Sequence, residues 1–162
     1  MNKKLLRFVV IVFCLYGNQS IAQTIEYVKL YDESLQLYES GNYDEAQKTL
    51  KRLLKKYPKE TDALMLMGNI EMKKENWSKA KDWFADVTKI QLNHIDAFYK
   101  LGICDREDGI GRDIVTQMIM WKNSKKHFHT VILLDSTYQQ VYYEYALLKR
   151  YQKEYQAAID LC

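Results

Sequence analysis

Residues 64–84 read LMLMGNIEMKKENWSKAKDWF, and several of these positions recur along the chain at one fixed interval. Gly68 recurs as Gly102, 34 residues later, and three more positions have counterparts 34 residues earlier, where Tyr43, Ala46 and Leu50 precede Trp77, Ala80 and Phe84. The next interval is 44 residues for every column and the one after it is again 34; the later members are Trp121, Ser124, Phe128, Ala146, Tyr155 and Ala158. Columns that shift together indicate one structural unit copied along the chain, with ten residues inserted into the third copy.

Each copy contains two segments with the apolar spacing of an α-helix, separated by a turn. A helix pair of this size cannot bury its own apolar face, so neighbouring pairs must stack on one another. We therefore predict an all-α solenoid of stacked antiparallel helix pairs with about three and a half repeats. The predicted copies cover residues 27–60, 61–94, 95–138 and 139–162, with the inserted residues near 109–120.

The pattern resembles that of the tetratricopeptide repeat (TPR) family over residues 27–162. In that family a large residue, a leucine-like residue and a small residue follow one another in the first helix, and Leu64, Met67 and Gly68 fill these places in the second copy. An aromatic residue and an alanine follow in the second helix, here Trp77 and Ala80. The resemblance implies a scaffold that binds a protein or peptide partner and carries no enzyme activity.

Some positions depart from the family pattern. Glu33 stands where the first copy should have a leucine-like residue, and the usual aromatic residue near the end of the first helix is replaced by Glu71, Asp105 and Lys149. We expect looser packing at these places. The fourth copy stops at Cys162, midway through its expected second helix. This favours a natural chain that is longer, or a partner that covers this end.

A narrower resemblance rests on residues 101–107, on the long second helix of the third copy and on residues 135–138 and 145–151. These segments are similar to the N-terminal repeat region of exported bacterial GWxTD-domain proteins. The motif that names that family is absent from the present sequence. The resemblance implies a bacterial envelope protein and does not by itself imply an activity.

The first 22 residues have the pattern of a secretory signal peptide. Lys3, Lys4 and Arg7 accompany an apolar stretch over residues 5–16, and the small-residue site Ser20-Ile21-Ala22 follows. An uncleaved membrane anchor is the alternative, but the apolar run is about half of the roughly 20 residues that span a bilayer. We predict cleavage after Ala22 and export to the periplasm or cell envelope of a bacterium, or secretion.

The apparent basic character of the chain comes from this segment. Without its three basic residues the total of 24 falls to 21, which equals the number of acidic residues. A neutral mature chain gives no reason to expect nucleic acid as a partner. After cleavage we also expect no integral membrane span.

A binding groove is predicted along the first helices of the copies, because the TPR resemblance places certain positions on the inner face. The predicted groove residues are Tyr31, Leu35, Tyr38, Met65, Asn69, Met72, Tyr99, Ile103, Arg106, Tyr143, Leu147, Arg150 and Tyr151. Tyr and Arg dominate binding hot spots, and Met adapts to varied partners. The groove is expected to hold an extended peptide or a partner helix; the alternative is that these side chains pack against neighbouring repeats or against the rest of a larger protein.

One family mode of binding is not expected. TPR domains that hold a chain terminus use a set of Lys and Asn residues, the carboxylate clamp. Tyr31, Leu35, Leu66 and Asp96 occupy most of the corresponding places here, and only Lys100 matches. Binding of chaperone tails in that way is therefore disfavoured.

The inserted residues in the third copy predict a longer second helix. Gly109 and Gly111 break the helix before it, and a second helix from Arg112 onward would be longer by roughly 15 Å at about 1.5 Å per residue. This extension carries an apolar stripe made of Ile114, Val115, Met118 and Ile119. The stripe needs a partner, which is another domain of the parent chain, a second subunit, or the first helix of the same repeat.

Residues with catalytic or metal-binding potential do not form a recognisable site in the sequence, so no catalytic residue, cofactor or metal is predicted. His127 and His129 are two residues apart on a predicted helix and are interpreted as surface residues. The run from Asp105 to Asp108 is interpreted as a solvated helix end. Cys104 and Cys162 are interpreted as core thiols, with a disulfide between them as the alternative.

The function predicted from the sequence is that of an exported, non-enzymatic scaffold that binds a protein or peptide through its groove. The alternative is an accessory N-terminal repeat region of a larger cell-envelope protein whose activity lies beyond residue 162. A third hypothesis is a structural role in a homo-oligomer joined through residues 109–120.

Overall fold

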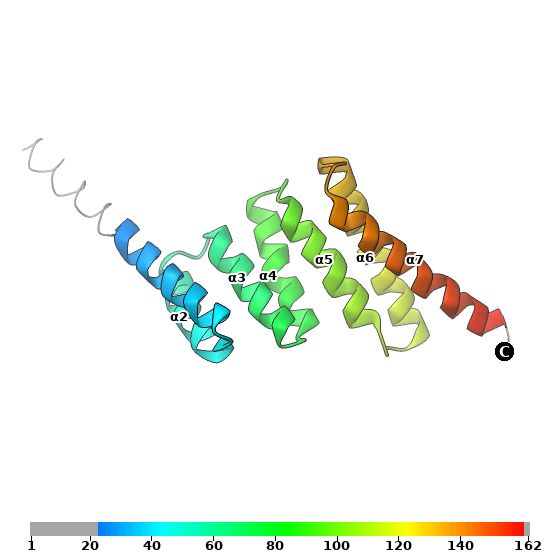
Figure 1. Ribbon diagram of the computed structural model, residues 1–162, viewed down its shortest axis with the longest axis horizontal. Coiled ribbons are helices and arrows are strands. Elements are labelled where there is room, and N and C mark those ends of the chain that lie inside the picture. Colours follow the sequence, from blue (N-terminus) through cyan, green and yellow to red (C-terminus); the bar gives the residue numbers. More distant parts are fainter. Residues whose placement is uncertain (1–22, 161–162) are drawn as a thin grey trace, which may run out of the picture. The chain divides into compact units, whose positions relative to one another are not determined.

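The computed structural model describes residues 23–160, with side chains up to residue 153, and every regular element in that range is an α-helix (Figure 1). The all-α prediction is confirmed. The predicted signal peptide at residues 1–22 and the side chain of Cys162 lie outside the described residues. The chain divides into two units, Met1–Pro58 and Lys59–Cys162, and each is taken by itself below.

The first unit is one helix pair. Residues 23–39 are helical and are followed by α2, Tyr43–Lys56. Gly41 in the turn has a φ of 79°, a left-handed conformation that glycine adopts without a steric penalty. The helices turn their apolar faces toward each other, so that Ala46, Leu50 and Leu53 are fully buried.

Tyr57 closes the first unit at the end of α2. Its hydroxyl donates a hydrogen bond to the backbone carbonyl of Gln23 at 3.0 Å, and its ring meets that of Tyr27 edge-on at 5.7 Å. Lys56 forms an ion pair with Glu26. These contacts tie the start of the first described helix to the end of α2, and this is the reason the helical segment reaches back beyond Tyr27, where it was predicted to begin.

The second unit contains five helices in succession. They are α3 Thr61–Lys73, α4 Trp77–Ile90, α5 Ile95–Gly109, α6 Ile114–Leu134 and α7 Gln139–Asp160. Each helix packs on the next one, and α5 also contacts α7, as in a stack of helix pairs (Figure 1). The second unit thus contains two helix pairs and one further helix. With the helix pair of the first unit, this agrees with the predicted three and a half repeats.

The close approach of paired helices depends on two glycines. A Cβ atom added to Gly68 of α3 would lie 2.4 Å from Cε1 of Phe84 on α4, and one added to Gly102 of α5 would lie 2.3 Å from Cε1 of Phe128 on α6. Both phenylalanine side chains are fully buried. The small and the large residues that recur in the sequence therefore contact each other within each pair. Ser124, which replaces the recurring alanine, donates a buried hydrogen bond to the carbonyl of Gly102 at 2.7 Å.

The inserted residues are distributed over the third pair. Compared with the second pair, α6 is seven residues longer than α4, α5 is two longer than α3, and the connecting loop is one longer. The second helix of the third pair is therefore extended by about 10 Å, at about 1.5 Å per residue, and not by the predicted 15 Å. The helix begins at Ile114 and not at Arg112, because Asp113 caps it by accepting hydrogen bonds from the backbone amides of Val115 at 3.2 Å and Thr116 at 3.0 Å.

The fourth copy differs from the prediction. Gln139–Asp160 is a single helix of 22 residues, whereas the repeat pattern placed the start of a second helix near Tyr155. The corresponding turns in the first two copies contain Gly41-Asn42 and Glu75-Asn76. Residues 153 and 154 are Lys and Glu, both good helix formers, so nothing in the local sequence ends the helix there.

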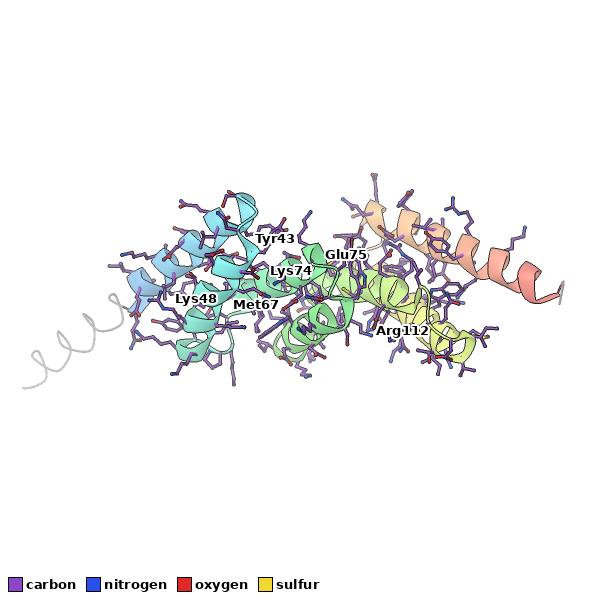
Figure 2. The ribbon with its side chains drawn as sticks, turned by 90° about the horizontal axis from the view of Figure 1, so that it is seen from below. Tyr43, Lys48, Met67, Lys74, Glu75 and Arg112 are labelled. Carbon is purple, nitrogen blue, oxygen red and sulfur yellow. The ribbon has the colours of Figure 1, made fainter. Side chains whose placement is uncertain are left out.

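Glu75 occupies the position of Gly41 in the second copy and has the same left-handed backbone, with a φ of 57°. It is labelled in Figure 2, next to Lys74 in the turn between α3 and α4. A residue with a Cβ atom loses roughly 1–2 kcal/mol in this conformation. The turn is therefore strained at one residue.

We expect Gly102→Ala to destabilise the protein. Alanine favours the helix by about 1 kcal/mol over glycine, but overpacking against the fully buried Phe128 ring costs roughly 1–3 kcal/mol, and a 2.3 Å contact is at the severe end. Urea unfolding followed by circular dichroism measures the difference. In the double variant Gly102→Ala/Phe128→Leu the two substitutions should couple favourably by about 1 kcal/mol or more. Additive effects would show that this contact does not set the helix spacing.

We expect Glu75→Gly to stabilise the protein by about 0.5–1 kcal/mol, because relief of the left-handed strain exceeds the extra chain entropy of glycine. Thermal unfolding of the variant measures the gain. Lys74→Gly is the matched control, since Lys74 has a φ of −90° and gains nothing from glycine. An equal gain in both variants would contradict the strain at Glu75.

Candidate functional site

The predicted groove residues of the first unit lie in one row. Tyr31, Leu35 and Tyr38 are half-buried and follow one another on successive turns of the same helix. The ring of Tyr31 stacks on that of Tyr27 with centroids 6.0 Å apart, and the ring of Tyr38 lies 5.8 Å from that of Tyr43. Aromatic contacts within the unit thus orient both predicted tyrosines.

The remaining ten predicted residues belong to the second unit, and we call them the first-helix face. They form one row on each of α3, α5 and α7: Met65, Asn69 and Met72; Tyr99, Ile103 and Arg106; Tyr143, Leu147, Arg150 and Tyr151. Their burial differs greatly. Met65 and Arg106 are buried, with 8% and 6% of their surface exposed, whereas Tyr143 is 70% exposed and Arg150 is also exposed.

Arg106 and Tyr99 of α5 are engaged by Glu144 of α7. Arg106 donates from Nη1 to Glu144, and its Nε and Nη2 donate to Glu107 Oε1 at 3.0 and 2.6 Å. The Tyr99 hydroxyl donates to the other oxygen of Glu144 at 3.5 Å, and its ring lies 5.2 Å from that of Tyr138. These two side chains hold α7 against α5, so they act inside the unit and not on its open surface.

The phenols on this side are held in their protonated form. Burial, reinforced by the Glu144 carboxylate, raises the pKa of Tyr99 to about 12. Burial together with Asp96, which accepts a hydrogen bond from the Tyr138 hydroxyl at 3.3 Å, raises the pKa of Tyr138 to about 12. Both phenols therefore remain hydrogen-bond donors at neutral pH.

A second polar cluster lies between α4, α5 and α6. Lys81 is 3.1 Å from a carboxylate oxygen of Asp105 and 3.1 Å from one of Asp108. His127 Nε2 lies 3.3 Å from the other oxygen of Asp105, and Arg112, labelled in Figure 2, is 2.8 Å from Asp108. Burial alone would lower the pKa of Lys81, but the two carboxylates outweigh it and raise that pKa.

Two sequence interpretations are wrong here. The run from Asp105 to Asp108 is not a solvated helix end, because Asp105, Arg106 and Asp108 are buried beneath the neighbouring helices. His127 is not a surface residue, since it is partly buried, pairs with Asp105 and stacks on Phe98 with ring centroids 6.2 Å apart. Only His129 is exposed as expected.

Groups that could support catalysis have structural roles. Cys104 is a free, fully buried thiol, and burial raises its pKa to about 12, as expected for a core cysteine. The imidazole of His94 caps α5 by accepting a hydrogen bond from the amide of Ala97 at 3.1 Å. Within residues 23–160, no cluster of three or more His, Cys, Asp or Glu side chains could hold a metal ion, and no helix is long and apolar enough to cross a membrane.

Comparison with known proteins finds a family match over part of the chain. Residues 37–101 match the family model described as the tetratricopeptide repeat. The fold is similar to that of TTC0263, a thermophilic TPR protein of Thermus thermophilus, with a TM-score of 0.69 and 16% identity over 82% of this chain and 69% of that one. Residues 37–101 therefore carry the tetratricopeptide repeat pattern, and the described part of the chain has the fold of TPR proteins.

Two further TPR-like structures were solved with peptides. The second TPR domain of human RPAP3, in complex with the HSP70 peptide SGPTIEEVD, has a TM-score of 0.66 and 16% identity over 78% of this chain and 98% of that one. The Yersinia enterocolitica type III secretion chaperone SycD, in complex with a peptide of the translocator YopD, has a TM-score of 0.64 and 12% identity over 76% and 92%. At these identities the likeness concerns the fold.

Acidic residues occupy the position near the end of the first helix where the repeat usually has an aromatic residue, and the structure shows how they are accommodated. Asp105 fills that place with the ion pairs to Lys81 and His127, and Glu71 fills it by accepting a hydrogen bond from Asn76 Nδ2 at 2.8 Å. The packing is therefore not looser at these two residues. Polar contacts replace the aromatic contact of the family pattern.

Glu144, which binds Arg106, was missed in the sequence analysis. It lies one position after Tyr143, outside the columns that the repeat assigns to the groove. Glu144 is the one acidic residue among residues 139–153 of α7, but the sequence analysis placed Arg106 in an open groove, where an arginine does not require a buried carboxylate. The pairing partner could not be named before the register of α5 against α7 was known.

We expect Glu144→Gln to loosen α7. The substitution keeps the shape but leaves the buried Arg106 without one of its two carboxylates, which costs roughly 1–3 kcal/mol. Hydrogen exchange should become faster in residues 139–153 and remain unchanged in α4. Glu45→Gln removes the same charge at an exposed site and is the control. Equal exchange in the two variants would show that the pair does not hold α7.

Proposed function

We propose that this protein is a non-enzymatic scaffold that binds a segment of a partner protein on its first-helix face. The observation that carries the proposal is the row of Tyr143, Leu147 and Arg150 on α7. These residues follow one another on successive turns, and Tyr143 keeps 70% of its surface exposed. Exposed Tyr and Arg on one rigid helix are the residue types that anchor protein interfaces.

The half-buried part of the face supports the same role. Ile103 and Tyr151 pack against the buried cluster around Trp121, with the rings of Tyr151 and Trp121 stacked at 6.3 Å. The guanidinium of Arg150 lies 5.7 Å from the centroid of the Tyr151 ring. Arg150 and Tyr143 are thus presented from a helix whose other side is anchored in the core, which limits the entropy lost on binding.

A binding role without catalysis is supported by the state of the ionisable groups. Asp105 and Asp108 are committed to Lys81, and the high pKa values of Tyr99 and Cys104 keep those groups from exchanging protons near neutral pH. General acid–base catalysis works best with a pKa near the operating pH. These groups are accounted for as parts of the fold.

The partner segment is proposed to be apolar or amphipathic and not an acidic chain terminus. Lys100, the one residue that matches the carboxylate clamp, lies 3.9 Å from Asp96 on its own helix, and Arg106 is bound to Glu144. Neither cation is available to a free carboxylate.

We further propose that the protein acts in the periplasm or cell envelope, on the basis of the signal-peptide pattern in residues 1–22. An exported protein meets only partners that are present in the same compartment. The partner is therefore expected in the envelope fraction of the cell and not in its cytosol.

A photo-cross-linker tests the proposal. With benzoylphenylalanine in place of Tyr143, irradiation of the protein in an extract of its own cell envelope should give a specific protein adduct, identified by mass spectrometry. The same probe in place of Leu133, which is 73% exposed on α6, is the control and should not give that adduct. Arg150→Ala should reduce the yield several-fold without changing the melting temperature by more than a few degrees.

The choice of Tyr143 over Tyr99 matters for this test. Tyr99→Ala would remove contacts to Tyr138 and Glu144 and would destabilise the unit, so a loss of binding could not be interpreted. Identical adducts from positions 143 and 133, or an Arg150→Ala variant that cross-links at full yield, would contradict binding on this face.

A further inference from the structure

The inserted residues create an exposed apolar patch at the start of α6. Ile114, Val115, Met118 and Ile119 keep 42%, 62%, 58% and 55% of their surface exposed, and we call them the α6 quartet. The opposite side of the same turns faces α5, where a Cβ on Gly109 would lie 3.3 Å from Met120 and Trp121. The quartet therefore does not pack on the first helix of its own repeat, which was one of the three alternatives for this stripe.

The patch is apolar without interruption. No charged residue occurs from Ile114 to Trp121, and the nearest charges along the helix are Asp113 at one end and Lys122 at the other. Proteins seldom leave four large apolar side chains contiguous and exposed unless the surface has a partner. The pattern of side chains in the patch indicates which kind of partner would cover it.

The spacing of the quartet is the same whether the helix is followed from its N-terminus or from its C-terminus. Its members occupy positions i, i+1, i+4 and i+5, so a second α6 running in the opposite direction presents the same pattern. A two-fold axis midway between residues 116 and 117 sets Ile114 opposite the partner's Ile119 and Val115 opposite the partner's Met118. The same operation brings each Lys122 to the end of the partner helix that carries Asp113, where the neighbouring Arg112 is already paired with Asp108.

We propose that the α6 quartet is the contact of a homodimer, in which the first turns of α6 from two copies pair antiparallel about a two-fold axis. The occupant is a second copy because the apolar pattern and the terminal charges are both self-complementary, as an isologous interface requires. This surface is on α6 and is separate from the α7 row that is proposed to bind the partner segment.

The pairing is expected to be weak. Four side chains per copy cannot bury the roughly 800 Å² per partner of a standard stable interface. Dimerisation should therefore depend on protein concentration in the micromolar range or above, and it should follow mass action. A tight dimer at the lowest measurable concentration would need more surface than the quartet provides and would contradict the proposal.

Sedimentation equilibrium of the purified protein from about 5 μM to about 500 μM tests the proposal. The average mass should rise from that of a monomer toward that of a dimer. Met118→Lys places two like charges near the axis and should weaken dimerisation at least tenfold. Leu133→Lys is the control, because it puts the same charge on an exposed apolar site of the same helix outside the quartet. Circular dichroism verifies that both variants are folded.

Besides a tight dimer, two further results of this experiment overturn the proposal. One is a monomer at every concentration. The other is an equal effect of Met118→Lys and Leu133→Lys, which would place the contact elsewhere. A monomer that binds vesicles of phosphatidylethanolamine and phosphatidylglycerol, and loses this binding in Met118→Lys, would also overturn it and would assign the quartet to a lipid surface.

The register is tested by disulfide trapping in a background where Cys14, Cys104 and Cys162 are changed to Ser. A chain with Val115→Cys mixed with a chain with Met118→Cys should cross-link between unlike chains under mild oxidation, because these positions face each other. Each chain alone should cross-link more slowly. Faster cross-linking between like chains would reject the antiparallel register.

Discussion

The contact on which the structure depends is that between a glycine on one helix and a phenylalanine ring on the next. Because Gly68 and Gly102 have no Cβ atom, the rings of Phe84 and Phe128 lie directly against the neighbouring backbone. This contact sets the spacing within the second and third pairs. The spacing in turn determines which side chains of the first helices stand in rows and which are buried. The positions of the surface side chains therefore depend on the absence of a Cβ atom at these two glycines.

The charged residues of the second unit act chiefly as replacements for apolar contacts. Asp105 occupies a place where the repeat normally has an aromatic side chain, and its ion pairs with Lys81 and His127 join three helices. The pair between Arg106 and Glu144 does the same between α5 and α7. Such buried pairs are demanding, since removal of one partner leaves an uncompensated charge. These pairs fix the register between neighbouring helices. Because their side chains are engaged inside the unit, partner binding is proposed for the exposed residues.

The two surfaces proposed here have different origins. The row of Tyr143, Leu147 and Arg150 belongs to the repeat itself, at positions that every copy presents on its first helix. The α6 quartet belongs to the inserted residues and has no counterpart in the other copies. A repeat protein can therefore bind a partner with its regular face and associate with itself through an irregular one, because the two faces lie on different helices.

The helix pairs, the columns of small and large residues that contact each other, the number of inserted residues and the apolar character of the α6 quartet could all be predicted from the sequence. These follow from spacing along one chain, which local helix geometry converts directly into faces. The packing of the helices was needed to show that Glu144 binds Arg106, that His127 is partly buried beside Asp105, and that the quartet faces away from α5. These outcomes depend on the register between helices that are 20 to 40 residues apart in the chain. Periodicity defines the face of a helix, but the residue that it meets on the next helix is set by packing.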